Sequence, residues 1–371
     1  MSKGQRESVL LARLVDLACQ IQQVPAPTLK ETERALFVRD LFESERLHDV
    51  SMDAVNNVFA RLPGRSPASP LVVTAHLDTV FTTTSNALTR DPERICGPGI
   101  GDNSLGVAAL FGLIWMLRDG GITLDTDLWL VANSCEEGLG DLRGMKAVVD
   151  RFGRGVSAYL VLEGTALGQV YHRAVGVQRY RVSVETLGGH SWSDYGRPSA
   201  VHELASIVTQ LAALPLPSTP RTTINVGTIA GGSGINVLAS HAHFELDVRS
   251  EGADTLESVV GRIEERIRAA RREGVDVKME LIGHRPAGQI SGSHPLVRLA
   301  VECISGQGLK ASLTSGSTDA NVPLSRGIPS IVLGVTTGAG AHTQQECIDT
   351  PPIAKGMRQL YSFVTRLATG S

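Results

Sequence analysis

Four short apolar runs in the chain each lead to charged or imidazole side chains, directly or through a short loop. The runs are rich in Val, Leu and Ile, which is typical of strands buried on both faces of a parallel sheet. They cover residues 71–75, 128–132, 159–162 and 330–333. Helical patterns over residues 7–42 and 105–117 accompany them. This alternation predicts an α/β fold with an open, mainly parallel sheet.

The pattern changes to an alternation of apolar and polar residues between residues 177 and 286. Such alternation is typical of antiparallel strands with one solvated face. It occurs at 180–184, 244–248 and 275–281, with helical patterns at 200–214 and 255–272. These elements supply both helices and three of the four strands of a ferredoxin-like β-α-β-β-α-β unit, which we take as the order of this segment. We therefore predict an α/β domain at 1–176 and 287–371, into which an α+β domain at 177–286 is inserted.

Charged and imidazole groups follow the C-terminal ends of the predicted buried strands. They are His76, Glu136, Glu137, Glu163 and His342. In an open α/β sheet, ligands bind outside the carboxyl ends of the strands, so these side chains should converge on one crevice. Asp102 joins them from a glycine-rich loop, where it lies beside the positive N-terminus of the apolar helix predicted at 105–117.

These candidate ligands are nitrogen and oxygen donors without sulfur. Two histidines, one aspartate and three glutamates suit zinc, cobalt or manganese in a catalytic rather than a structural site. His241 and His243 also share one strand face, but no third ligand accompanies them, so we interpret them as a solvated pair. We interpret Cys135, beside Glu136, as a small buried residue rather than a nucleophile.

Composition and charge exclude several classes of partner. The chain has 371 residues, 42% of them hydrophobic, and a net charge of -3 without a Lys/Arg block. We therefore expect neither nucleic acid nor a membrane surface as a partner. No apolar run approaches the roughly 20 residues of a membrane span. The glycine-rich loop at 97–103 lacks the Lys-Ser/Thr ending of a P-loop and the G-x-G-x-x-G spacing, which argues against nucleotide binding.

The cysteines are scattered and odd in number, and none belongs to a C-x-x-C pair. They are Cys19, Cys96, Cys135, Cys303 and Cys347. This usage predicts neither a disulfide framework nor a thiolate zinc site. A reducing, cytoplasmic location fits it best.

The motifs around the candidate ligands resemble those of a known family. His-Leu-Asp-Thr-Val begins at His76, Gly-Pro-Gly-Ile-Gly-Asp ends at Asp102, Glu-Glu-Gly begins at Glu136, and Gly-Ala-His ends at His342. In order and spacing, the chain resembles the M20 metallopeptidases, close in pattern to glutamate carboxypeptidase and to the peptidase T-like proteins. The resemblance implies a zinc-peptidase catalytic core and an inserted lid and dimerisation domain.

The resemblance also implies a centre of two divalent ions, zinc with cobalt or manganese as alternatives. The implied ligands are His76 and Glu163 as terminal ligands, Asp102 as the bridge, and Glu137 and His342 to complete the pair. Glu136 would be the general base. Asp78 would orient His76, because a carboxylate beside a ligand histidine fixes the tautomer of the imidazole.

In the inserted domain, the resemblance assigns one histidine to catalysis and three residues to substrate binding. They are His190 in Gly-Gly-His-Ser, and Asn236, Arg249 and Arg285. His190 would stabilise the oxyanion in the active site of a partner subunit. A guanidinium matches a carboxylate bidentately, so Arg285 favours a substrate with a free carboxylate next to the cleaved amide. Trp192 and Tyr195 would form an apolar wall for the substrate or pack a dimer interface.

Two positions leave the interpretation open. Many relatives carry a second acidic residue or a lysine after Asp102, whereas Asn103 and Ser104 follow here, so the charge around the ions differs. Asp319, in Gly-Ser-Thr-Asp, either holds the amine of a ligand or only fixes its turn.

We therefore expect a cytoplasmic homodimer that hydrolyses a peptide or amide bond next to a free carboxylate, with two metal ions and Glu136 as general base. The expected partner is a small peptide or an N-acyl amino acid. An N-acyl-amino-acid deacylase with the same site is the alternative. An alternative of another class is a non-catalytic, metal-dependent binding protein for peptides or metabolites, against which the presence of Glu136 argues.

Overall fold

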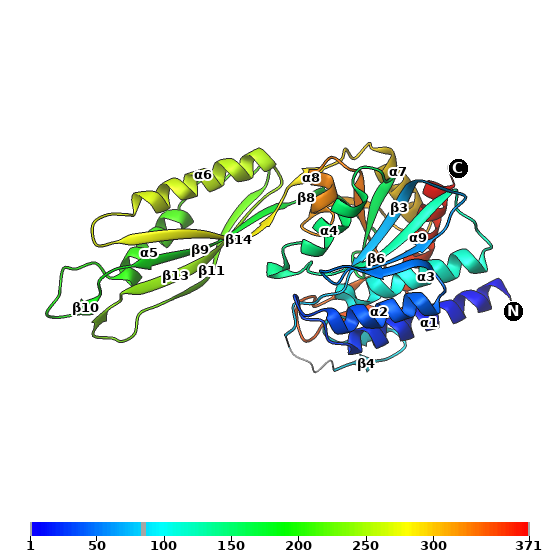
Figure 1. Ribbon diagram of the computed structural model, residues 1–371, viewed down its shortest axis with the longest axis horizontal. Helices are drawn as coiled ribbons and strands as arrows, with labels where there is room; N and C mark the ends of the chain where they lie inside the picture. Colours follow the sequence, from blue (N-terminus) through cyan, green and yellow to red (C-terminus); the bar gives the residue numbers. More distant parts are fainter. Residues whose placement is uncertain (1, 83–86, 370–371) are drawn as a thin grey trace. The chain divides into compact units, whose positions relative to one another are not determined.

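The computed structural model describes residues 2–82 and 87–369 (Figure 1). The chain divides into two compact units. Unit 1 comprises Met1–Arg173 together with Gln289–Ser371, and unit 2 comprises Ala174–Gly288. Each unit has its own buried apolar core, as expected of segments that pack helices against a sheet.

A mixed sheet forms the centre of unit 1. Its strands lie in the order β1-β2-β6-β3-β7-β17-β8-β15, and β16 pairs with β8. Their bounds are β1 His48–Met52, β2 Val58–Leu62, β3 Ser66–His76, β6 Thr126–Asn133, β7 Ala158–Glu163, β8 Gln169–Ala174, β15 Gly288–Gln289, β16 Ser312–Gly316 and β17 Ser330–Gly334.

The strands in the middle of this sheet pair in parallel, β3 with β6 and β7, and β7 with β17. Antiparallel pairing joins β1 to β2, β2 to β6, and β8 to β17. The sheet is therefore mixed, and the predicted mainly parallel sheet describes only its central strands. The difference has a physical reason: β8 alternates buried and half-buried residues, which is typical of antiparallel strands that are covered on one face.

Helices cover both faces of the sheet (Figure 1). One face and its core receive α1 Lys3–Gln23, α2 Thr32–Ser44, α3 Leu105–Asp119, α7 Pro295–Ser305 and α9 Ile353–Ala368. The opposite face receives α4 Arg143–Phe152 and α8 Asn321–Ser325. In β3, Leu71 and Val73 enter the first core, whereas Val72 enters the second. Alternate residues of one strand are thus buried on opposite faces, which explains the continuous apolar runs.

One stretch of the described chain, Ile100–Asp119, is long and apolar enough to cross a membrane by composition alone. Its mean hydropathy reaches 1.5, and 89% of the most apolar window is buried inside the protein. The stretch consists of the short segment Ile100–Ser104, whose backbone is not helical at Asp102 and Asn103, followed by α3. The expectation that no apolar run reaches this length is therefore wrong, and burial in the core of unit 1 accounts for the composition.

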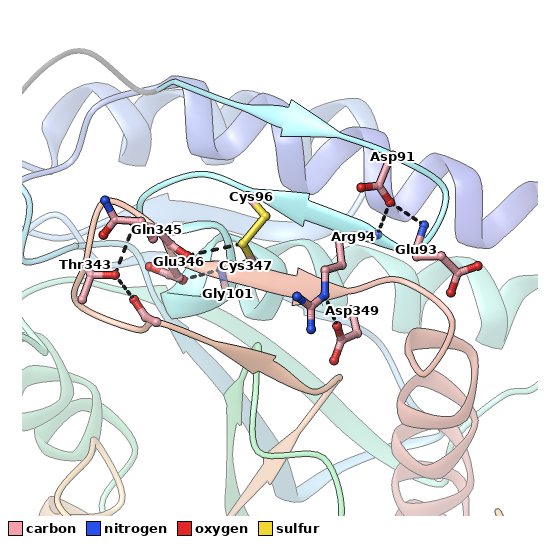
Figure 2. Close-up of a disulfide and its surroundings, with 11 residues drawn as sticks. Asp91, Glu93, Arg94, Cys96, Gly101, Thr343, Gln345, Glu346, Cys347 and Asp349 are labelled. Carbon is pink, nitrogen blue, oxygen red and sulfur yellow. Dashed lines mark hydrogen bonds and ion pairs between the residues drawn. A yellow bond between two sulfur atoms is a disulfide. The ribbon is translucent and has the colours of Figure 1, made fainter.

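A small antiparallel sheet joins two segments that lie far apart in the sequence (Figure 2). Its strands, in spatial order, are β18 Gly338–Ala339, β19 Cys347–Asp349, β5 Arg94–Cys96 and β4 Thr89–Arg90. Cys96 and Cys347 lie opposite each other in β5 and β19 and form a disulfide. The expectation of unpaired cysteines is wrong for this pair. The two residues are 251 positions apart, so their spacing gave no sign of pairing.

The remaining cysteines, Cys19, Cys135 and Cys303, are free. Disulfides persist in oxidising environments and are rare in the cytosol. The Cys96–Cys347 bond therefore gives no support to the cytoplasmic location expected from cysteine usage.

Unit 2 packs two helices against an antiparallel sheet. Its elements are β9 Gly176–Glu185, β10 Gly189–His190, α5 Ala200–Ala212, β11 Thr222–Gly231, β12 Val237–Leu238, β13 His241–Ser250, α6 Ala253–Ala269 and β14 Asp276–Arg285. The sheet has the order β11-β13-β9-β14, and β10 pairs separately with β12. In β13, buried residues alternate with more accessible ones. The buried residues meet the apolar faces of α5 and α6, which explains the period of two in the sequence.

Candidate metal centre

The C-terminal end of β3 carries His76 and Asp78, both of them buried. The main-chain oxygen of Asp78 lies 3.0 Å from His76 Nδ1, closer than its carboxylate at 3.6 Å. The carboxylate accepts the main-chain N–H groups of Glu136 and Glu137, each at 2.9 Å, and the hydroxyl of Thr28 at 2.9 Å. Asp78 thereby fixes the end of β3 to the segment that follows β6.

Asp102 lies in the short segment Ile100–Ser104 that precedes α3, where its own backbone is not helical (φ −117°, ψ 82°). Its Oδ1 is 3.0 Å from His76 Nε2, and its Oδ2 is 3.0 Å from His342 Nε2. Burial disfavours the charged form of Asp102, but the hydrogen bonds to His342 and His76 outweigh the effect of burial. They hold the pKa of Asp102 below its usual range. The carboxylate therefore presents one oxygen to each histidine, as a bridging ligand requires.

Two further carboxylates approach the histidines from other strand ends. Glu163, the last residue of β7, places Oε2 3.7 Å from His76 Nε2. Glu137 places Oε1 3.1 Å from His342 Nε2. Hydrogen bonds to Asp102 and Glu137 raise the pKa of His342 to about 10, whereas burial raises the pKa of Glu163. The structure thus brings the five predicted ligands together around Asp102.

The donor set fits a divalent cation. One ligand atom from each of His76, Asp102 and Glu137 lies within 4.8 Å of the other two. Carboxylates that gather at this range repel one another, and the repulsion is strong where water is largely excluded. A divalent ion would offset it, and imidazole with carboxylate donors suits zinc, cobalt or manganese.

The sequence of the whole region around this cluster matches a known family. Residues 72–366 match the model of peptidase family M20/M25/M40. The chain belongs to this family. It is therefore a hydrolase of the M20 metallopeptidases, and the residues of the cluster make a metal site in it chemically reasonable.

Individual M20 proteins resemble the chain over almost its full length. A succinyl-diaminopimelate desuccinylase from Corynebacterium glutamicum is 24% identical over 91% of this chain and 90% of its own. The aminopeptidase PepT from Bacillus cereus superimposes with a TM-score of 0.80 at 23% identity, covering 97% of this chain and 99% of that one. A Bacillus subtilis protein, named as a dinuclear metal binding M20 peptidase, superimposes with a TM-score of 0.71 at 16% identity. The match covers 97% of this chain and 99% of that one. The structural likeness shows a shared fold.

In this M20 chain, the segment after β6 carries Cys135 and Glu136 next to Glu137. Glu136 is buried, with an exposed fraction of 6%, and its main-chain N–H is held by Asp78. Burial and the nearby Glu31 raise the pKa of the Cys135 thiol to about 12, so little thiolate forms at neutral pH. This segment therefore offers a carboxylate rather than a thiolate for proton transfer.

The other site residues expected from the M20 resemblance belong to unit 2. They are His190, Asn236, Arg249 and Arg285. His190 ends β10 and is exposed, and its Nδ1 accepts the main-chain N–H groups of Trp192 and Ser193 at 3.2 and 3.4 Å. The imidazole is thereby held at the start of an exposed loop.

The three residues expected to bind substrate differ in their surroundings. Asn236 is exposed, and its main-chain oxygen accepts the N–H of Ser191 at 3.0 Å. Arg249 donates to Asp247 from Nε at 2.6 Å and from Nη2 at 3.3 Å. Arg285, at the end of β14, is buried with an exposed fraction of 5%. The guanidinium of Arg249 is thus already paired with a carboxylate within unit 2.

Two residues beside the cluster were not singled out for these contacts from the sequence. The Asn103 side chain donates to the main-chain oxygen of Leu162 and accepts the N–H of Gly164, both at 2.8 Å. The Glu346 carboxylate accepts three main-chain N–H groups of the loop that carries Asp102. Burial raises the pKa of Glu346 to about 7, although these N–H groups oppose the shift. In the sequence, only position could have pointed to these two residues. Asn103 directly follows Asp102, and Glu346 lies in the segment after His342.

Asp319, whose role the sequence left open, is completely buried. One carboxylate oxygen accepts the side-chain N–H of Asn133, the last residue of β6, at 2.7 Å. Burial raises the pKa of Asp319 to about 7. The contact connects the loop after β16 to a strand end that lies three residues before Glu136.

Proposed function

We propose that the protein hydrolyses a peptide or amide bond next to a free carboxylate, using two divalent metal ions. The observation that carries the proposal is the Asp102 carboxylate, which reaches His76 with one oxygen and His342 with the other. Glu163 lies near the first histidine and Glu137 near the second. This arrangement provides two ligand sets that share one carboxylate.

In this proposal His76 and Glu163 would hold one ion, Glu137 and His342 would hold the other, and Asp102 would be shared by the two sets. When bound, two such ions polarise an amide carbonyl and make water acidic enough to attack it at neutral pH. Zinc fits the donor set, and cobalt or manganese can replace it. Asp78 keeps the ligand segments in place through its contacts with main-chain N–H groups.

Glu136 is the proposed general base. It accepts a proton from the attacking water and delivers it to the leaving amine. Its position supports this role, because it directly precedes Glu137 and is buried at the same strand end. A protein that only bound metal and peptide would gain nothing from a second carboxylate at this position.

The substrate carries a free carboxylate, and Arg285 is the proposed group that binds it. A guanidinium forms two parallel hydrogen bonds with a carboxylate. Arg249 already forms hydrogen bonds with Asp247 within unit 2. Asn236 would assist Arg285 with its side-chain amide.

Two classes of amide fit this site. The first is a dipeptide or the C-terminal residue of a small peptide. The second is an N-acyl amino acid, and similarity to a succinyl-diaminopimelate desuccinylase favours it. The two classes differ in the acyl group of the amide, which carries an amino group in a peptide but not in an N-acyl amino acid.

We further propose that unit 2 acts as a lid and dimerisation domain and that His190 acts in the active site of a partner subunit. The exposed aromatic residues in the loop after His190 support this, since Trp192 and Tyr195 have exposed fractions of 86% and 90%. Large aromatic residues at the surface are typical of interfaces. A chain that stays monomeric and fully active at high dilution would contradict the role in trans.

A panel of substrates tests the proposed function. It contains dipeptides, N-acetyl and longer N-acyl amino acids, and the same compounds with the terminal carboxylate converted to an amide. We expect hydrolysis of one of the first two groups after loading with zinc, loss of activity with chelator, and little activity on the amides. Equal activity on the acid and amide forms would contradict a role for the free carboxylate.

A further inference from the structure

The segment after His342 returns to the loop that carries Asp102, and Glu346 makes the connection (Figure 2). Glu346 is buried, with an exposed fraction of 1%. Its Oε1 accepts the main-chain N–H groups of Gly101 and Asp102, each at 2.7 Å. Its Oε2 accepts the N–H of Gly99 at 2.8 Å. One carboxylate therefore holds the loop on which Asp102 is carried.

The loop is shaped to admit this carboxylate. A Cβ added at Gly101 would lie 3.1 Å from Glu346 Oε1 and 2.9 Å from a methyl group of Ile348. Gly99 has a φ of +74°, which glycine adopts at little cost. Three donors converge on two oxygens, and an ionised carboxylate is the side chain that can only accept. A glutamine would turn its NH₂ group toward one of these donors.

Glu346 is also fixed to the turn that carries His342. Its main-chain N–H donates to Thr343 at 3.2 Å, and the N–H of Thr343 donates to Gly340 at 3.0 Å. Its main-chain oxygen accepts the N–H of Gly97 at 2.8 Å. The next residue, Cys347, forms the disulfide with Cys96 (Figure 2). The loop of Asp102 and the turn of His342 are thus fastened to each other at Glu346.

A different residue fastens the other side of the Asp102 loop. Asn103 bonds to the main chain of Leu162 and Gly164, the two neighbours of Glu163. A Cβ at Gly106 would lie 2.0 Å from Asn103 Oδ1, so the helix start leaves room for this amide. Asn103 therefore holds the Asp102 loop next to Glu163 through contacts that do not involve Glu346.

We propose that Glu346 is a positioning residue that sets the spacing between Asp102 and His342, and thereby the retention of one of two metal ions. The ion concerned is the one assigned to Glu137 and His342. This inference rests on the proposed two-ion centre. Groups that orient metal ligands commonly contribute about 10–100-fold to metal affinity. Loss of Glu346 should selectively weaken the binding of the ion assigned to Glu137 and His342, because Asn103 still holds the loop near Glu163.

The test compares Glu346→Gln with the wild-type chain and with Glu93→Gln. Glu93 is an exposed glutamate in the turn between β4 and β5 of the same small sheet (Figure 2), so it controls for the change of charge. Each protein is loaded with zinc and equilibrated with increasing concentrations of a chelator. Zinc per chain is counted by mass spectrometry, and the melting temperature is recorded with and without zinc.

We expect two ions per chain in the wild type and in Glu93→Gln. In Glu346→Gln, one ion should be retained normally and the other bound about 10–100-fold more weakly, with a smaller rise of the melting temperature on adding zinc. Two ions of unchanged affinity, or the parallel loss of both, would overturn the inference alone. A wild-type chain that does not bind two ions would overturn the proposed function as well.

A conservative variant covers the case in which Glu346→Gln does not fold. Glu346→Asp keeps the charge but shortens the side chain, so it cannot reach all three N–H groups. The same selective weakening is expected, to a smaller degree. Wild-type retention of both ions in a folded Glu346→Asp would overturn the inference.

Discussion

At the scale of single residues, the metal centre depends on carboxylates that contact several groups at once. Asp102 reaches two histidines, and Asp78 accepts two main-chain N–H groups and a hydroxyl. In the metal-free chain, the nearest acceptor for His76 Nδ1 is the main-chain oxygen of Asp78. The orientation of His76 therefore depends on the backbone of Asp78 at least as much as on its side chain.

The first prediction concerns Glu136. Glu136→Gln removes the group that accepts a proton while preserving the shape of the side chain. We expect a fall in kcat of about 10²–10⁴-fold with KM and zinc content close to those of the wild type. Steady-state kinetics and metal analysis check this. Unchanged kcat would exclude Glu136 as the general base and would reopen the non-catalytic alternative.

The second prediction concerns pH. Asp102 and Glu137 raise the pKa of His342 to about 10 in the metal-free chain. A histidine must lose its proton to bind a metal. A proton therefore competes with the ion below pH 10, and metal affinity should rise with pH, by about tenfold per unit for each proton displaced. Zinc titrations between pH 6.5 and 9 measure this. An affinity that is constant over that range would contradict the contacts of His342.

The residues found from the sequence and those missed differ in kind. His76 and Glu163 stand where apolar runs end, and His342 follows the run at 330–333 after a glycine-rich loop, so the strand pattern and the family motifs both pointed to them. Glu346 and Asn103 act through hydrogen bonds to main-chain groups. Such contacts depend on how distant loops meet in space, and no spacing in the sequence reports them.

At the scale of elements, periodicity predicted the buried strands and the helices well and their connections less well. The apolar run at 71–75 lies in β3, and the run at 330–333 lies in β17. Residues 48–62 form the antiparallel pair of β1 and β2, and the turn-forming residues Asp53, Asn56 and Asn57 lie between the two strands. The mixed pairing of the outer strands was not predicted, because pairing direction is decided by tertiary contacts.

The third prediction concerns the disulfide between β5 and β19. Cys96→Ser or Cys347→Ser should lower the free energy of unfolding by about 2–4 kcal/mol, because the bond closes a very long loop. Urea unfolding measures this, and Cys19→Ser, which changes a free cysteine, is the control. The denatured wild-type chain should show three reactive thiols before reduction. Five thiols without a reductant would contradict the bond.

At the scale of the whole molecule, the chain combines two independently packed units. Unit 1 contains the complete donor cluster, from His76 in β3 to His342 after β18. The ligands come from both segments of unit 1, so unit 2 is inserted between Glu163 and His342 in the sequence. The alternation of period two in the sequence falls within unit 2, whose strands bury alternate residues against α5 and α6.

The identity of the substrate depends on contacts that the sequence motifs do not specify. The motifs identify a centre that hydrolyses amides, but the same ligands serve peptidases and deacylases alike. In the proposed function, Arg285 favours substrates with a free carboxylate, because the geometry of a guanidinium matches a carboxylate. The substrate panel therefore decides between dipeptide and N-acyl amino acid.

We propose a pair of metal ions that share Asp102 as a ligand. A count of zinc ions per chain is the most decisive test of this pair. The measurement is made by mass spectrometry on wild-type protein and on Asp102→Ala, after loading and removal of free metal. We predict two ions in the wild type and a loss of the pair in Asp102→Ala, since one carboxylate serves both positions. A single ion in the wild type, or two ions retained without Asp102, would contradict the account.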